Sequence, residues 1–164
     1  MRLRTFLAFL MVSALATMAE AQTKISGTAQ CSKPDPQYAI EVGDRPNHAF
    51  GIFQGKCTWT KGLEIAGTES KEHVGTVFQE ISGNRATLHG SGVDTMASGD
   101  KFFVRTQGKS TLKDGAVETD EGTWNFAGGT GKLKGLKGKG TFKRKGAGDG
   151  TATYEIEGEY ELPK

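Results

Sequence analysis

The sequence is poor in the residues and motifs that usually mark an enzyme. It has three histidines, and none of them stands at a spacing typical of metal ligands, such as HExxH. It has no Gly-x-Ser-x-Gly motif, and no glycine-rich segment ends in the Gly-Lys-Ser/Thr of a phosphate-binding loop. These absences predict no metal site, no cofactor and no identifiable catalytic residue.

Long apolar runs are missing after the N-terminus. The single run, residues 6–16, follows two arginines and is shorter than the roughly 20 residues that a membrane-spanning helix needs. A small-x-small pattern that ends at Ala21 comes next. These features predict a signal peptide over residues 1–21, cleaved after Ala21. The mature chain, residues 22–164, is then secreted or periplasmic and has no membrane span.

Cysteine is scarce as well, because Cys31 and Cys57 are the only two. An even pair in an exported chain is typical of a disulfide. A metal or redox pair would need closer spacing or histidine partners, and the sequence offers neither. We therefore predict a bond between Cys31 and Cys57, which stabilises the fold by roughly 3–4 kcal/mol in the chain-entropy view.

Neither sign of charge dominates. The chain has 21 Lys and Arg residues against 19 Asp and Glu residues, a formal net charge of +2, and this balance argues against a general polyanion binder. A basic cluster at residues 131–145 is expected to face alternating glutamates in a C-terminal hairpin, with Lys139 opposite Glu157. Cross-strand charge pairing explains that cluster better than a nucleic-acid site does. No nucleic-acid partner is predicted.

Glycine, in contrast, is abundant, with 24 residues that all follow the predicted signal peptide. Turns rich in glycine separate short runs of alternating apolar and polar residues, spaced about 8–14 residues apart, and no long helical period occurs. We found no internal repeat and no linker. The pattern predicts an all-β chain with a single barrel or sandwich domain over residues 22–164.

The most informative stretch is GTWNFAGGTGKLKGLKGKGTF in the C-terminal third. Trp124 and Phe126 share one face of an expected strand. A double glycine then allows the backbone to take positive φ and reverse its direction. Thr130 is expected to cap a short helical turn through its hydroxyl. Leu133 and Leu136 share a side of that turn and are expected to plug the end of a sheet.

The glycines of this stretch carry a family resemblance. The motif GGTG at residues 128–131, followed by KLKG at residues 132–135 and a further Gly-x-Gly, resembles the signature of allene oxide cyclase and dirigent proteins. It is also similar to uncharacterised bacterial secreted proteins with that barrel. The resemblance implies an approximately eight-stranded antiparallel, calycin-like β-barrel with a short helical turn near Lys132–Leu136 and an apolar cavity. The plant relatives use their cavity for cofactor-free cyclisation or for steering radical coupling, but none of their active-site residues has a match here.

A second hairpin suggests what lines the cavity. The turn Asp114-Gly115 predicts that Arg105 faces Trp124 and that the neighbouring aromatic rings pair on the inner face. Tyr154 joins them, because it alternates with glutamates in the last hairpin. Aromatic rings with a few orienting polar groups are typical of a ligand pocket. The predicted ligand-binding residues are Phe103, Arg105, Gln107, Trp124, Phe126 and Tyr154.

The charges on this hairpin leave another interpretation open. They could form a solvated rim, with a bulge that shifts the pairing register; the residues concerned are Arg105, Lys109, Glu118 and Asp120. A small outer-membrane barrel is less favoured, because neither face of residues 117–125 gives a continuous apolar band.

Three classes of function remain open from the sequence. The first is an exported barrel that binds a small apolar or amphipathic ligand. The second is a cofactor-free cyclase- or isomerase-like enzyme that uses the same cavity. The third is a structural or envelope interaction protein with a filled barrel. The presence and lining of a cavity separate these classes, whereas ligand identity and oligomeric state are not predicted.

Overall fold

The structure, a computed structural model, describes residues 22–163. The predicted signal peptide, residues 1–21, lies outside the described residues. Within the described part the chain is almost entirely β-structure, with one short 3₁₀ turn, η1. The elements are β1 (Thr23–Cys31), β2 (Gln37–Glu41), β3 (His48–Lys61), β4 (Glu64–Ile65), β5 (Thr68–Ser82), β6 (Arg85–Met96), β7 (Lys101–Lys113), β8 (Ala116–Gly129), η1 (Gly131–Leu133), β9 (Lys137–Gly146) and β10 (Ala152–Glu161).

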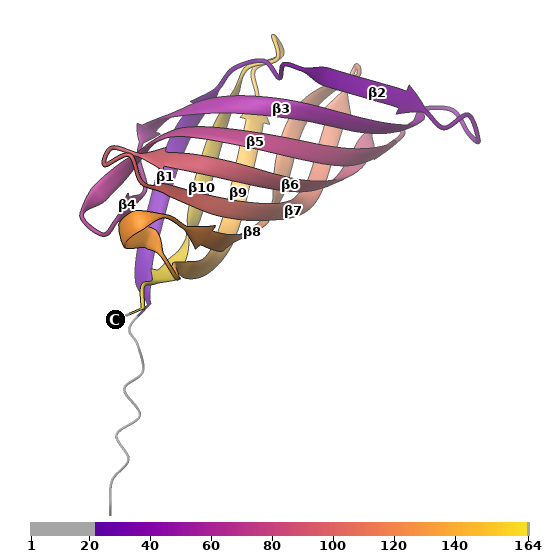
Figure 1. Ribbon diagram of the computed structural model, residues 1–164. Coiled ribbons are helices and arrows are strands. Elements are labelled where there is room, and N and C mark those ends of the chain that lie inside the picture. Colours follow the sequence, from indigo (N-terminus) through magenta and orange to yellow (C-terminus); the bar gives the residue numbers. More distant parts are fainter. Residues whose placement is uncertain (1–21, 164) are drawn as a thin grey trace, which may run out of the picture.

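The strands form one antiparallel sheet that closes on itself. Their order is β2-β3-β1-β10-β9-β8-β7-β6-β5-β4, and an additional β3–β5 pairing completes the barrel. Eight strands make the closed wall, while β2 and β4 are short additions at the two ends of this order (Figure 1). The predicted all-β, eight-stranded antiparallel barrel is therefore confirmed. Among the described residues, no helix is long and apolar enough to cross a membrane.

One end of the barrel is packed with apolar side chains, and we call it the filled end. Leu133 and Leu136, from η1 and the segment after it, are fully buried there, which confirms that this turn plugs the sheet. Thr130 does not cap the turn, because its hydroxyl instead accepts a hydrogen bond from the Lys101 N–H at 2.8 Å. The other buried side chains of the filled end are Ile25, Leu63, Ile65, Met96, Phe102 and Phe126.

The opposite end has an interrupted wall, and we call it the open end. The second half of β3 pairs with β1, whereas its first half pairs with β2. Within residues 22–163, strand β2 stands at the end of the sheet order and has no second neighbouring strand, so no ladder links it to β10. Figure 1 shows β2 diverging from the C-terminal strands at this end. The barrel is thus continuous at the filled end and incomplete at the open end.

The β7–β8 hairpin differs from the predicted register by one residue. The turn does place Leu112 opposite Val117, but a bulge between Thr111 and Leu112 moves every later pair. Arg105 faces Asn125 instead of Trp124 as a result. Because side chains alternate with a period of two, a one-residue shift reverses the face of the whole strand. The predicted pairing of Arg105 with Trp124, and of the residues around them, was wrong for this reason.

The β9–β10 hairpin differs by two residues, with milder consequences. Lys139 faces Glu159 instead of Glu157, and Lys143 faces Glu155. A shift of two keeps each side chain on its face, so lysines and glutamates still alternate across the outer surface. Cross-strand charge pairing is confirmed, although its register was predicted incorrectly.

Cys31 and Cys57 form the predicted disulfide. They are directly opposite each other on β1 and β3, near the place where β1 ends. The bond therefore fastens the two strands at the edge of the open end. A disulfide is compatible with an extracytoplasmic protein.

Candidate functional site

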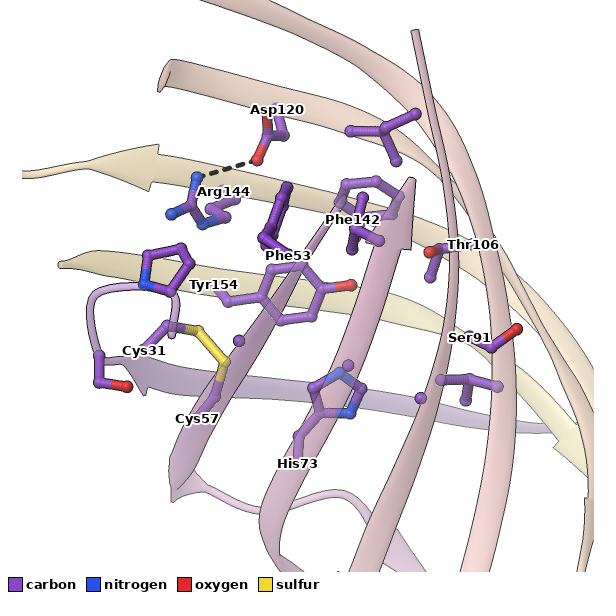
Figure 2. Close-up of a pocket in the computed structure, with 18 residues that line it drawn as sticks. Cys31, Phe53, Cys57, His73, Ser91, Thr106, Asp120, Phe142, Arg144 and Tyr154 are labelled. Carbon is purple, nitrogen blue, oxygen red and sulfur yellow. Dashed lines mark hydrogen bonds and ion pairs between the residues drawn. A yellow bond between two sulfur atoms is a disulfide. The ribbon is translucent and has the colours of Figure 1, made fainter. Parts of the chain in front are cut away.

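A cavity of about 90 Å³ lies inside the barrel, toward the open end. Its wall is mostly apolar and comes from all eight barrel strands and from the loop after β1 (Figure 2). Side chains on the inner faces of the strands, which alternate with solvent-facing ones, supply most of the lining. The lining includes the disulfide, aromatic rings, glycines and several polar side chains: Cys31, Phe53, Gly55, Cys57, His73, Gly75, Gly92, Thr106, Asp120, Phe142, Arg144 and Tyr154.

Aromatic rings form the apolar part of the wall. Tyr154 on β10 packs against Phe142 on β9, with ring centroids 5.5 Å apart, and Phe53 on β3 lies close by in Figure 2. Burial, followed by the carboxylates of Asp94 and Asp120, raises the pKa of the Tyr154 phenol well above its usual value. The hydroxyl of Tyr154 therefore stays protonated and remains a hydrogen-bond donor inside the cavity.

A nearly buried ion pair stands beside these rings. Arg144 on β9 donates to Asp120 on β8 at 3.0 Å, and their side chains are 16% and 9% exposed. The arginine uses one of its five N–H groups in this bond. The second oxygen of Asp120, Oδ1, is buried and has no hydrogen-bond partner among the described residues. An unsatisfied buried acceptor is unusual and costs about 1–3 kcal/mol.

A histidine–aspartate pair occupies another part of the wall. His73 Nδ1 on β5 lies 2.8 Å from Oδ2 of Asp94 on β6, and Oδ1 of Asp94 accepts a 2.8 Å hydrogen bond from Trp59 Nε1. Asp94 is 1% exposed, whereas the His73 side chain is 16% exposed and borders the cavity. The carboxylate is thus fully buried and satisfied on both oxygens, and it holds the imidazole in one orientation.

The positions of glycines determine where the barrel interior has space for a side chain or for the cavity. A Cβ atom on Gly75 would lie 2.8 Å from His73 Nε2, and one on Gly92 would overlap the same ring. These two glycines therefore make the space that the imidazole occupies. At Gly55, which also borders the cavity, a Cβ would meet no atom within 4 Å. The cavity exists partly because no side chain projects from that position.

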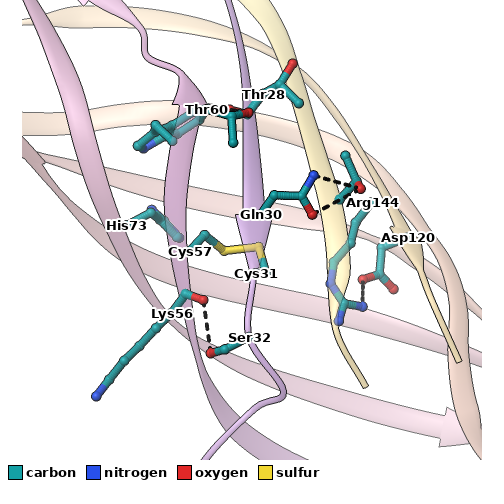
Figure 3. The surroundings of a disulfide bond; sticks show 12 residues. Thr28, Gln30, Cys31, Ser32, Lys56, Cys57, Thr60, His73, Asp120 and Arg144 are labelled. Carbon is teal, nitrogen blue, oxygen red and sulfur yellow. Dashed lines mark hydrogen bonds and ion pairs between the residues drawn. A yellow bond between two sulfur atoms is a disulfide. The ribbon is translucent and has the colours of Figure 1, made fainter. Parts of the chain in front are cut away.

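The disulfide forms part of the same wall. Cys31 and Cys57 both border the cavity, and Figure 3 shows their bond joining β1 to β3 near His73. At the end of β1, the hydroxyl and the N–H of Ser32 both bond to the carbonyl oxygen of Lys56. The open end of β1 is thus held to β3 by covalent and hydrogen bonds at the point where the wall is interrupted.

The structure separates the six predicted ligand-binding residues into three groups. Tyr154 lines the cavity. Trp124 and Phe126 are on the inner face as predicted, but they lie in the packed core, around a smaller void of about 20 Å³. The bulge places the remaining three on the outer surface, away from the cavity: Phe103, Arg105 and Gln107.

Sequence reasoning missed the charged residues of the site, although part of the signal was present. Asp120 shares the predicted inner face of Trp124 by strand alternation, but the sequence left open whether it belongs to a pocket or to a solvated rim. His73 was treated as isolated, yet a two-residue turn at Gly83-Asn84 sets His73 directly opposite Asp94. Writing out that hairpin would have predicted the pair.

No cluster of three or more histidine, cysteine or acidic side chains that could hold a metal ion occurs within residues 22–163. The site is therefore described by its rings, its ion pair and its histidine–aspartate pair.

Comparison with known proteins supports the fold. No family model and no curated protein matches the chain. Among solved structures, a protein of unknown function from the DUF3224 family of Shewanella oneidensis MR-1 is similar, with a TM-score of 0.53 and 18% identity over 87% of this chain and 100% of that one. At this identity the likeness shows a shared barrel fold alone. It agrees with the barrel that the glycine signature implied.

Two further structures superpose less well. Pyocyanin demethylase has a TM-score of 0.44 and 18% identity, over 81% of this chain and 98% of its own. A pterocarpan synthase dirigent protein has a TM-score of 0.47 and 13% identity, over 98% of this chain and 100% of its own.

Proposed function

We propose that this protein binds a small amphipathic molecule in the cavity at the open end of the barrel. The observation that carries the proposal is the Oδ1 atom of Asp120, a buried acceptor without a partner beside an apolar cavity. A ligand hydroxyl or amine would satisfy that atom after a small movement of the Asp120 side chain exposes it to the cavity. Arg144 has further N–H groups, which would donate hydrogen bonds to a carbonyl or carboxylate oxygen of the ligand.

The size of the cavity limits how the ligand is held. An apolar cavity of about 150 Å³ accommodates benzene, so about 90 Å³ accepts only part of a ring-sized molecule. We expect one apolar edge of the ligand to pack against Tyr154 and Phe142, with the remainder toward Ser32 and Pro34, which border the same cavity. Arg144 takes the orienting role that the sequence had assigned to Arg105.

The proposal includes export. A signal peptide over residues 1–21 would deliver the chain to an oxidising compartment, where the Cys31–Cys57 bond forms readily. Intact mass of the protein recovered from the secreting cell tests this, because the expected product begins at Gln22 and carries no free thiol. A product that retains residues 1–21 would contradict export by cleavage.

Isothermal titration calorimetry with 4-hydroxybenzoate and with benzoate tests this binding. The two probes share a ring and a carboxylate, and only the first has a hydroxyl donor for Asp120. We expect 4-hydroxybenzoate to bind more tightly, and Asp120→Asn to remove roughly 10-fold or more of that preference, as for a hydrogen bond to a charged group. An equal loss for both probes would contradict the role of Asp120 Oδ1.

A matched pair of leucine substitutions tests the location. Gly55→Leu fills the cavity from a position where a side chain meets nothing nearby, whereas Thr58→Leu adds the same side chain on the exposed face of the same strand. We expect Gly55→Leu to abolish binding of both probes and Thr58→Leu to leave it unchanged. Unchanged binding by Gly55→Leu would place the ligand elsewhere. No binding by the parent protein would favour the structural class.

A further inference from the structure

We propose that His73 acts as a general base in the cavity and transfers a proton on a small carbonyl compound bound there. The proposal rests on the proposed binding function and extends it to a reaction class, keto–enol isomerisation. Its foundation is that one ring nitrogen of His73 has no partner among the described residues and lies over glycines that border the cavity, while the other is held by a buried carboxylate.

Asp94 fixes the state of the imidazole. Its buried carboxylate lies 2.8 Å from Nδ1 of His73, and a carboxylate oxygen accepts hydrogen bonds only. The Nδ1 atom therefore carries the proton, and in the neutral ring Nε2 keeps its lone pair. Trp59 donates to the other oxygen of Asp94 and prevents the carboxylate from turning away. Asp94 is a positioning residue, and His73 is the group that would contact the substrate.

The Nε2 atom of His73 lies over Gly75 and Gly92, two glycines that border the cavity, and a Cβ on Gly75 would be 2.8 Å from it. No residue of the described part hydrogen-bonds this nitrogen, whereas Nδ1 is held by Asp94. The ring of Tyr154 lies nearly parallel to the imidazole, at 18° and with centroids 6.4 Å apart (Figure 2). A base and a protonated phenol thus border the same small space.

The reaction balances without an oxidant, a reductant or a further reactant. His73 Nε2 takes a proton from the carbon next to the substrate carbonyl. The electron pair of the broken C–H bond forms the C=C bond, and the carbonyl π pair moves to oxygen, which accepts a hydrogen bond from the Tyr154 hydroxyl. Asp94 stabilises the resulting imidazolium, which returns the proton to the substrate oxygen or to carbon.

The cysteines of the wall offer no competing nucleophile. The two are joined in a disulfide, so neither supplies a thiolate. The charged groups that border the same space are Asp120 on β8 and Arg144 on β9, whereas Asp94 on β6 is fully buried against His73. Arg144 would hold a carboxylate on the substrate, which favours small aromatic 2-oxo acids as the substrate class.

Phenylpyruvate is the probe, because it combines a ring, a carboxylate and an acidic C–H next to a carbonyl. Proton nuclear magnetic resonance in D₂O follows exchange of its C3 hydrogens, and calorimetry measures its binding separately. We expect the protein to speed exchange above buffer. His73→Gln should leave binding within about twofold and lower the exchange rate by on the order of 100-fold. His89→Gln, on the exposed face of β6, is the matched control and should exchange like the parent.

Two further variants separate chemistry from structure. Free imidazole should restore part of the exchange in His73→Ala, since it enters the space left by the ring, and a purely structural role gives no such rescue. Asp94→Asn should slow exchange while phenylpyruvate still binds, because the amide holds the imidazole in the wrong tautomer.

The outcomes distinguish this proposal from the binding function beneath it. No binding of phenylpyruvate, while 4-hydroxybenzoate still binds, would overturn the general base alone. No binding of either probe would overturn both proposals. Binding without exchange above buffer, or exchange that survives His73→Gln, would overturn the general base and leave the binding function standing. Thermal unfolding of each variant shows whether the fold persists. If His73→Gln does not fold, the imidazole rescue of His73→Ala decides the role of His73 instead.

Discussion

The two ends of the barrel use glycine in opposite ways. At and near the filled end, inner-face glycines lie beneath large side chains, and a Cβ on Gly158 would come within 2.5 Å of the Trp124 ring. Trp59 covers Gly27 in the same manner. At the open end Gly75 and Gly92 still lie beneath the His73 ring, but Gly55 faces empty space. The same residue type therefore permits dense packing where a ring covers it and creates a cavity where none does.

The two ends also differ in their buried polar groups. The filled end is closed by leucines and phenylalanines that need no partners. The cavity, in contrast, is bordered by Asp120, whose Oδ1 is unsatisfied, and by His73, whose partner Asp94 is fully satisfied. Apolar packing thus stabilises one end, and polar groups that border a small cavity distinguish the other. Four experiments, which measure stability or local protection, test this contrast between the two ends.

The largest effect is expected from Trp124→Ala. Trp124 is 3% exposed and its Nε1 donates to the carbonyl oxygen of Thr141, so its loss should lower the free energy of unfolding by about 3–5 kcal/mol. Phe53→Ala at the cavity should cost only about 1 kcal/mol, because that ring is partly exposed. Urea unfolding measures both values. Equal losses would mean that the two ends are packed alike.

The second effect concerns the disulfide. Replacing both cysteines, in Cys31→Ala/Cys57→Ala, should destabilise the protein by about 3–4 kcal/mol, as expected for a loop closed over 26 residues. The consequence should be local as well. Amide hydrogen exchange is expected to quicken in β1 and β3 near the cavity, while residues around Leu133 stay protected. Uniform loss of protection would show that the bond supports the whole barrel.

A pair of glycine-to-alanine substitutions gives the third, smaller effect. In Gly140→Ala the new Cβ collides with the Glu157 carbonyl oxygen and lies 2.7 Å from the Trp124 ring, so we expect a loss of about 1–3 kcal/mol. In Gly55→Ala the Cβ enters open space, and the stiffer unfolded chain should raise stability by about 0.4–1 kcal/mol. Chemical denaturation compares the two. Effects of the same sign would contradict the difference between the ends.

Strand alternation predicted the inner face of β8 and β10, whereas the closed barrel was implied by the resemblance that the glycine motif carries. The placement of Trp124, Phe126 and Tyr154 depends only on a period of two within one strand, and a register error of two residues in β9–β10 did not disturb it. The leucines of the turn were also placed correctly, because their spacing puts both on one side. Local periodicity is what a sequence encodes most directly.

Pairs between strands were harder to predict, since each depends on every residue between them. One bulge at Thr111/Leu112 turned Arg105 outward, and no residue type at that point marks it. Asp94 and His73 meet only because the turn between β5 and β6 has two residues. The volume of the cavity depends on the sum of many side chains across eight strands, so no single motif could reveal it.

The smallest effect is a pH dependence at the rim of the open end, where β3 begins. His48 is bonded to Asp44 and, at 3.2 Å, to Glu80. The hydrogen bond to Asp44, opposed by burial and assisted by Glu80, raises the pKa of His48 above its ordinary value of 6.5, and Arg45 acts in the lowering direction.

A raised pKa in the folded state gives stability that is fully present below the unfolded pKa of about 6.5 and is lost as the pH rises through the folded value. Urea midpoints should therefore fall modestly from pH 6 to pH 8, and His48→Gln should remove that part of the fall. His89→Gln, which changes an exposed histidine on β6, should keep it. If the two variants show the same pH slope as the parent, His48 does not contribute to stability through its charge. Because His48 stands away from the filled end, protection of the amides around Leu133 should change no more than the global stability does.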